Sequence, residues 1–192
     1  RYKIVLNSKK KLLAQKLYFF LSSIFITALV VSNLIFQKFF SWYPFNFEVF
    51  GIKLFELSVG VLPYPVTFLI TDIVSEIFGK RKANQVVVMG ILASIFSIGL
   101  LLLGDVLPAS SSSPIDDKTF NLVFSASPLA VLASMSAYLI AQFLDIRIYH
   151  FWKQLTQGKY LWLRNNFSTF SSQIIDSTTV IALLCIFDIL AW

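Results

Sequence analysis

The sequence has little of what enzymes use for metal-dependent or nucleophilic catalysis. Its 192 residues include one histidine, His150, and one cysteine, Cys185. A zinc site needs several clustered ligands and a disulfide needs two cysteines, so neither is expected within this chain. The sequence also has no G-x-S-x-G motif and no phosphate-binding loop. We therefore expect no catalytic residues, no metal site and no cofactor.

Charged side chains are also scarce. They make up 14% of the chain, against about 25% in soluble domains, whereas hydrophobic residues make up 57%. The net charge of +6 is spread over separate basic segments, so it indicates contact with the anionic head groups of a lipid bilayer and not with nucleic acid. The composition predicts an all-α polytopic membrane helical bundle.

Five apolar segments are long enough to cross a bilayer, which requires about 20 residues. We interpret residues 1–192 as a single transmembrane domain in which Pro128 kinks the fourth segment, since that segment is too long for one straight span. The predicted spans cover residues 17–40, 54–78, 84–103, 120–152 and 166–192.

The distribution of basic residues predicts the orientation of these spans. Of the 16 lysines and arginines, only Lys38, Lys53 and Lys118 fall on the side of the membrane opposite the N-terminus. The positive-inside rule therefore predicts a cytoplasmic N-terminus. The serine-rich loop that contains Ser110–Ser113 is expected on the outside.

The most informative segment covers residues 62–82, with the sequence LPYPVTFLITDIVSEIFGKRK. It is apolar, yet it carries Asp72 and Glu76 one helical turn apart, which places both carboxylates on one face. Ionisable groups inside a membrane span are costly, so they usually face a bundle interior, a partner or a ligand. This segment is therefore the first candidate for a functional site.

Two prolines interrupt the same segment. Pro63 and Pro65 lack backbone donors, so the carbonyls of Val59 and Val61 are expected to lose their helical partners. Free carbonyls at membrane depth occur in transporter binding sites, but they also occur at simple kinks, and the sequence leaves both interpretations open. Tyr64, which lies between the prolines, is placed to stack on a ligand or to hydrogen-bond to it.

Further polar residues fall inside the predicted spans or at their edges. They favour either a polar pocket for a flat heterocycle or hydrogen bonds that hold helices together, for example between Arg164 and Glu76. They are Asn33, Gln37, Glu56, Asp72, Glu76, Gln142, Asp145, Arg164, Asn165, Asn166, Gln173 and Asp176.

Several stretches resemble one known family. They are PYPVTFLITDIVSEIFGKRKA, VSNLIFQKFF and LWLRNNFSTFSSQIIDS, which occur in the same order as in the queuosine precursor transporter family, also called the vitamin uptake transporter family. The resemblance implies a six-helix importer in the cell inner membrane that carries 7-deazaguanine bases such as preQ0, preQ1 or queuine. It also implies that this chain holds five of the six spans, and the sequence leaves open whether a final helix after Trp192 is missing from it.

The resemblance and the pattern of polar residues together give a set of candidate substrate-binding residues. We expect Asp72 and Asp176 to face one cavity. An alternative is a substrate-binding membrane subunit of an ATP-driven vitamin uptake system, and the energy source, a coupling module and a homo-oligomer all remain open. The candidates are Asp72, Glu76, Asn33, Tyr64, Gln142, Asp145, Arg164, Asn165, Gln173 and Asp176.

Overall fold

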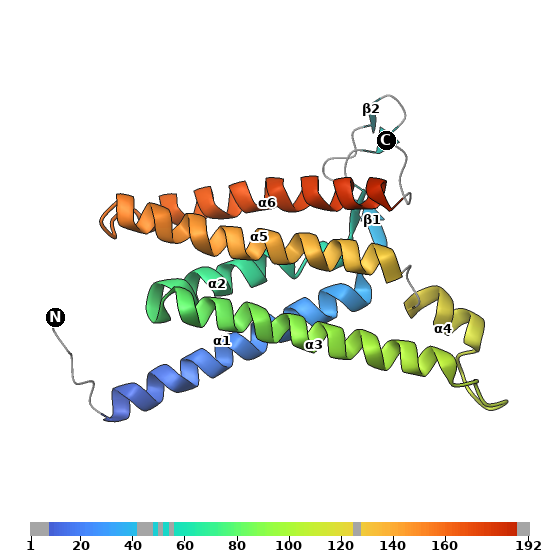
Figure 1. Ribbon diagram of the computed structural model, residues 1–192. Coiled ribbons are helices and arrows are strands. Elements are labelled where there is room, and N and C mark those ends of the chain that lie inside the picture. Colours follow the sequence, from blue (N-terminus) through green and yellow to red (C-terminus); the bar gives the residue numbers. More distant parts are fainter. Residues whose placement is uncertain (1–7, 42–47, 50–51, 54–55, 125–127, 188–192) are drawn as a thin grey trace.

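The computed structural model describes residues 8–41, 48–49, 52–53, 56–124 and 128–187. Long helices lie along one another in an elongated bundle (Figure 1), which confirms the predicted all-α membrane fold. Within the described residues, three helical segments are long and apolar enough to cross a membrane, namely Lys9–Ile35, Val59–Phe78 and Lys80–Val106. The helices are α1 (Ser8–Ile35), α2 (Tyr64–Phe78), α3 (Lys80–Val106), α4 (Asp117–Phe124), α5 (Pro128–Leu155) and α6 (Leu161–Ile186).

Short strands occupy part of the link between α1 and α2. β1 (Phe39–Ser41) pairs antiparallel with β4 (Glu56–Ser58), and β2 (Glu48–Val49) pairs with β3 (Ile52–Lys53). The second membrane segment therefore begins with the 3-10 turn η2 (Val59–Val61) and not at residue 54 as predicted. Within the described residues of this link, strand pairing gives hydrogen-bond partners to backbone groups that are not in a helix.

The predicted fourth span is two helices. We expected a single helix over residues 120–152 with a kink at Pro128, but the structure has α4 and then α5, which begins at Pro128. A proline fits the first turn of a helix because the amide hydrogen that it lacks has no helical partner there. Residues 125–127 lie outside the described residues, so a kink at Pro128 stays a prediction. The last helix begins at Leu161, earlier than the predicted residue 166.

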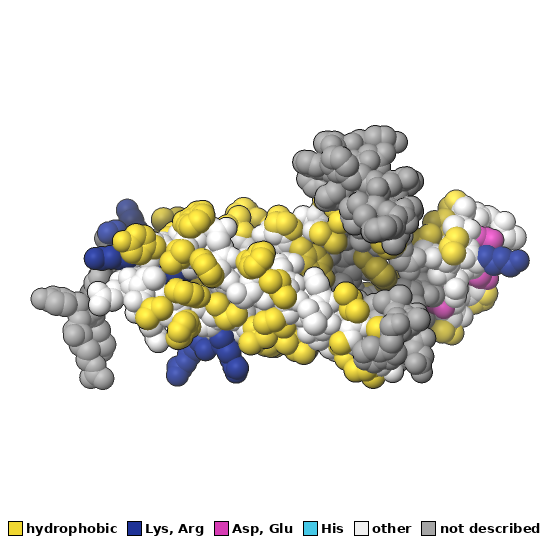
Figure 2. Space-filling model, turned by 90° about the horizontal axis from the view of Figure 1, so that it is seen from above, with side chains coloured by type: hydrophobic (Ala, Val, Ile, Leu, Met, Phe, Trp, Pro, Cys, Tyr) yellow, Lys and Arg dark blue, Asp and Glu magenta, His cyan; other side chains and the backbone are white. Residues whose placement is uncertain are grey.

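Charge is sorted along the bundle axis. The start of α1, the α2–α3 turn and the α5–α6 turn lie at the same end, at the left of Figure 1. Figure 2 shows most of the visible Lys and Arg side chains toward this end, acidic side chains together with some basic atoms at the opposite end, and hydrophobic side chains between the two ends. The α2–α3 turn depends on Gly79, whose φ of 84° is a conformation that other residues rarely adopt.

Neighbouring helices pack through small and apolar side chains. α6 packs mainly against α5, whereas α1 packs against α2 and α3. Ala133, Ala137 and Ala141 repeat every four residues along α5 and are all buried. Small residues at this spacing allow close helix contact, which is the main source of association between helices in lipid.

Candidate functional site

A cavity of about 450 Å³ lies between α1, η2, the start of α2, α5 and α6. We call it the α1–α6 cavity. Its volume falls within the roughly 300–1,000 Å³ typical of small-molecule sites. It contains four of the candidate residues from the sequence, Asn33, Tyr64, Gln173 and Asp176. The full lining is Ser32, Asn33, Phe36, Ser58, Gly60, Val61, Tyr64, Ser134, Gln173, Asp176, Ser177, Val180 and Ile181.

Gly60 allows η2 to lie directly on α1 and so forms one wall of the cavity. A Cβ atom at this position would lie 2.7 Å from the Cβ of Phe36 and 2.8 Å from the carbonyl oxygen of Ser32. The Ser32 hydroxyl donates to the Gly60 carbonyl, and the Ser58 hydroxyl accepts from the Gly60 amide at 3.1 Å. The wall therefore requires glycine together with two serines that the sequence analysis did not single out.

The two prolines start a helix instead of breaking one. Pro63 caps α2, and Pro65 lies in its first turn, where a missing amide hydrogen costs nothing. The Val59 carbonyl accepts from the Leu62 amide at 3.1 Å instead of from residue 63, so it is not a free carbonyl in the cavity wall. These prolines position Tyr64 at the edge of the cavity, because α2 begins at that residue.

Asp176 is the acidic group of the α1–α6 cavity. Its side chain is largely buried, and its Oδ1 has no hydrogen-bond partner among the described residues. It interacts electrostatically with the hydroxyl groups of Tyr64 and Tyr138. The rings of these two tyrosines meet edge to face with their centroids 5.4 Å apart. The cavity thus combines an available carboxylate with aromatic surface.

Gln142 bridges helices and does not line the cavity. Its Nε2 donates to the hydroxyl of Tyr138 at 2.9 Å, and its Oε1 accepts from the hydroxyl of Thr71 at 3.3 Å. All three side chains are buried. Gln142 therefore ties α5 to α2 and orients the tyrosine that lies behind Tyr64.

A second group of candidates forms a buried charge cluster, consisting of Asp72 on α2, Asp145 on α5 and Arg164 on α6. Their exposed fractions are 3%, 0% and 1%. Asp72 interacts electrostatically with both of the others, and Asp145 accepts from the hydroxyl of Ser172 at 3.2 Å. Asp72 does not line the α1–α6 cavity, so the expectation that it shares a cavity with Asp176 is wrong. Along α2 it lies about 12 Å beyond Tyr64, which separates it from the lining.

Glu76 connects this cluster to the basic end of the bundle. Its Oε2 accepts from the Tyr149 hydroxyl at 2.5 Å and from the Lys153 ammonium at 2.7 Å. Arg164 Nη1 lies 3.4 Å from the same oxygen, and the guanidinium lies over the Tyr149 ring at 5.4 Å. Glu76 thus takes part in an ion-pair network. Asn165, the remaining candidate, is half-buried and also lies outside the cavity lining.

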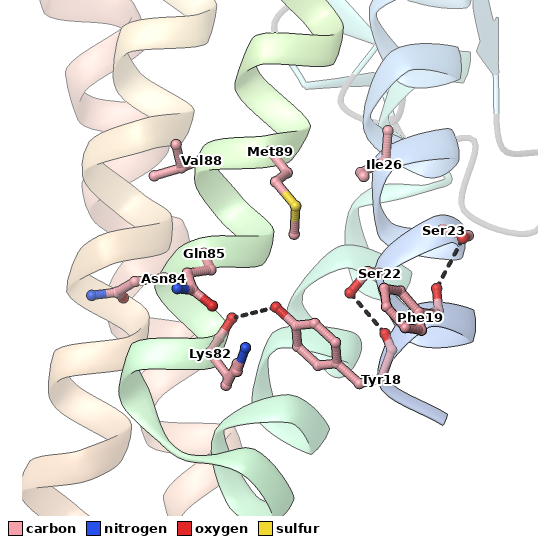
Figure 3. A pocket seen from close by; sticks show the side chains of 10 residues that line it. All are labelled: Tyr18, Phe19, Ser22, Ser23, Ile26, Lys82, Asn84, Gln85, Val88 and Met89. Atoms are coloured by element: carbon pink, nitrogen blue, oxygen red, sulfur yellow. Dashed lines mark hydrogen bonds between the residues drawn. The ribbon is translucent and has the colours of Figure 1, made fainter. Parts of the chain in front are cut away.

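A larger groove, of about 630 Å³, runs between α1 and α3 near the basic end (Figure 3). The Tyr18 hydroxyl donates to the Lys82 carbonyl at 3.3 Å, and the Lys82 ammonium lies 5.0 Å from the centre of the Tyr18 ring. Many of its lining side chains, such as Phe19, Val88 and Met89, are exposed on the outside of the bundle. None of the ten candidate residues lines it, so we do not take it as the substrate site.

The comparisons with known proteins agree with the sequence resemblance. A family profile described as "Putative vitamin uptake transporter" matches residues 58–192. A protein from Bacillus subtilis (strain 168), described as "Probable queuosine precursor transporter", is 28% identical over 148 residues. That match covers 76% of this chain and 63% of the relative's length. No solved structure matches.

The family profile spans well over half of the chain, from the end of β4 through α6 to the last residue. It includes the whole buried charge cluster and every lining residue of the α1–α6 cavity except Ser32, Asn33 and Phe36. The family resemblance found in the sequence is thereby confirmed, and this multi-pass membrane protein belongs to the vitamin uptake transporter family.

Proposed function

We propose that this chain imports 7-deazaguanine bases across the cell inner membrane and binds them in the α1–α6 cavity. The observation that carries the proposal is the Asp176 carboxylate, which lines a cavity of suitable size and has an oxygen without a hydrogen-bond partner among the described residues. The printed description of the Bacillus subtilis relative supports this substrate class, and the family description supports a role in uptake.

The chemistry of the cavity suits a guanine-like edge. Such an edge presents a ring N–H and an exocyclic amine side by side, and one carboxylate can accept both hydrogen bonds. The amides of Asn33 and Gln173 offer donors for the ring carbonyl. The rings of Phe36 and Tyr64 supply flat apolar surface for a heterocycle. Of the ten candidates, we therefore assign Asn33, Tyr64, Gln173 and Asp176 to substrate binding and the others to support or coupling.

Uptake of radiolabelled preQ0 tests this function. In cells that cannot make 7-deazaguanines, expression of the protein is expected to restore uptake and to restore queuosine in tRNA. Cells with an empty vector are the control. Wild-type expression without any gain in uptake or in queuosine would contradict the proposal. If purified protein in liposomes transports preQ0 only after a separate ATPase is added, the chain is a substrate-binding subunit of an ATP-driven system instead.

We also propose that the basic end of the bundle faces the cytoplasm, because positive charge concentrates there (Figure 2). A cysteine at Ser111, in the exposed loop of the opposite end, is expected to react with a membrane-impermeant maleimide in intact spheroplasts. A cysteine at Lys159, in the exposed α5–α6 turn, is expected to react only after permeabilisation. Cys185 is buried, so the unmodified chain serves as the unlabelled control. The reverse labelling pattern would overturn the orientation.

A further inference from the structure

We propose that Asp72 and Asp145 form a proton-binding pair that couples substrate import to proton movement. The inference rests on the proposed transport function and adds an energy source for it. The two residues come from different helices, α2 and α5, and neither lines the cavity in which we place the substrate. Their role must therefore be argued from the charges that surround them.

Both carboxyl groups lack partners that would stabilise a full negative charge. Asp72 Oδ1 and Asp145 Oδ2 are buried and have no hydrogen-bond partner among the described residues. The hydrogen bonds that we find to this pair in the described part of the chain come from two serine hydroxyls on α6, Ser172 and Ser168, and both go to Asp145. Two ionised carboxylates that interact in a buried site are unfavourable, and a proton held by one of them removes the repulsion.

The charge balance of the cluster also indicates one bound proton. Three carboxyl groups, those of Asp72, Asp145 and Glu76, face two permanent cations, Arg164 and Lys153. Lys153 is bonded to Glu76, and both side chains are about one-third exposed. Full ionisation would thus leave an excess negative charge around the buried aspartates. One proton on the pair makes the cluster neutral.

The other titratable groups around the cluster do not replace this proton. On α5, the hydroxyl of Tyr149 is already donated to Glu76. His150 interacts with Lys153, Lys80, Glu76 and Arg164, and three of these four are cations, which disfavour a second positive charge on its ring. On the cavity side, the ionisable groups are Tyr64, Tyr138 and Asp176.

Arg164 has unused hydrogen-bond donors, so the cluster can adopt one arrangement with the proton bound and another without it. Its Nε and Nη1 have no hydrogen-bond partner among the described residues, although Nη1 lies 3.4 Å from Glu76. These donors are available to an ionised aspartate once the proton leaves. The pair therefore has a protonated state with Arg164 toward Glu76, and a deprotonated state in which Arg164 compensates the aspartates. Two such states are what an ion-coupled transporter requires.

Polar side chains connect this pair to the substrate cavity and to the basic end. Toward the cavity, Thr71, next to Asp72, donates to Gln142, and Gln142 donates to Tyr138, which interacts with Asp176. Toward the basic end, Glu76 lies one helical turn beyond Asp72 and is partly exposed. The pair thus lies between the proposed substrate site and water, as a coupling site should.

Two assays on purified protein in liposomes separate coupling from binding. Wild-type protein is expected to accumulate radiolabelled preQ0 when a proton gradient is imposed, and to exchange preQ0 at equal pH. In Asp72→Asn and Asp145→Asn, the rate of preQ0 exchange is expected to stay within about twofold of the wild-type rate. Gradient-driven accumulation of preQ0 is expected to fall about tenfold or more below the wild-type level. Asp116→Asn, in an exposed loop, is the matched control and is expected to behave as wild type in both assays.

A third measurement does not depend on the substrate. Infrared spectra of the wild-type protein at neutral pH are expected to show a protonated carboxylic acid band that is lost in Asp72→Asn or Asp145→Asn. Failure of preQ0 exchange in wild type would overturn the proposed function, while the infrared band would still test the proton site. Unchanged gradient-driven accumulation in both variants, or a wild-type spectrum without the band, would overturn the coupling inference.

Discussion

Replacing Arg164 with glutamine is expected to lower the free energy of unfolding by about 3–5 kcal/mol, which is the usual cost of removing one partner from a buried ion pair. Arg164 is 1% exposed and interacts from α6 with Asp72 and Glu76. Without it, Lys153, which is bonded to Glu76, is the cation that remains in this network. Denaturant or thermal unfolding of the detergent-solubilised protein measures the change.

Arg147→Gln is the matched control for this measurement. Arg147 lies on α5, toward the same basic end as Arg164, but its side chain is exposed, so its loss is expected to change stability by no more than about 0.5 kcal/mol. Combining Arg164→Gln with Asp145→Asn is expected to recover part of the loss, because it removes one of the carboxylates left without compensation. Equal stability of Arg164→Gln and wild type would show that the buried charges do not depend on Arg164.

The stability deficit of Arg164→Gln is also expected to depend on pH. Protonation neutralises the carboxyl groups that Arg164 faces, so the deficit should shrink as the pH falls and grow as it rises. The same series with Arg147→Gln should show no such trend, because its surroundings are exposed to water. A deficit that is constant across pH would mean that Arg164 acts through packing, for example against Tyr149, and not through charge.

The long helices were predictable from the sequence, whereas their exact ends were not. Runs of about 20 apolar residues identify membrane helices by length alone. The short strands at residues 39–58 are not recognisable from hydrophobicity, because they satisfy backbone groups only through pairing in space. The sequence predicted a kink at Pro128, which is the first described residue of α5, because a proline inside a helix and one at its start look alike in one dimension.

The candidate residues were predictable as a set but not as separate groups. Helical spacing shows that Asp72 and Glu76 share a face, but it does not show which neighbouring helix supplies their partners. Asp72 meets Asp145 and Arg164, whereas Asp176 faces a cavity with Asn33. That separation depends on how α2 packs against α5 and α6. The sequence shows that α5 packs closely against a neighbour, through its repeat of buried alanines, but it does not show which helix that neighbour is.

Asp176→Asn is expected to reduce uptake of preQ0 by about ten- to a hundredfold, because a charge-assisted hydrogen bond contributes about 1.5–3 kcal/mol. The variant keeps the size of the side chain and removes only its charge and part of its accepting capacity. Asp105→Asn, at the other end of the bundle from the basic residues, is the control and is expected to transport as wild type. Initial rates over a range of preQ0 concentrations show whether the loss is in affinity.

A matched pair of ligands tests the role of Asp176 more sharply than the mutation alone. If its carboxylate accepts from both the ring N–H and the exocyclic amine, a 7-deazapurine base without the amine should bind more weakly to wild type. In Asp176→Asn one of the two acceptor oxygens is replaced by an amide N–H donor, so the side chain can no longer accept from both groups and the two bases should differ much less. The difference between the effect of the amine in wild type and its effect in Asp176→Asn then measures the contact itself. A general destabilisation of the variant would weaken both bases equally and would cancel in this comparison. An equal preference for the amine in both proteins would place the amine elsewhere in the α1–α6 cavity and leave Asp176 without the proposed contact.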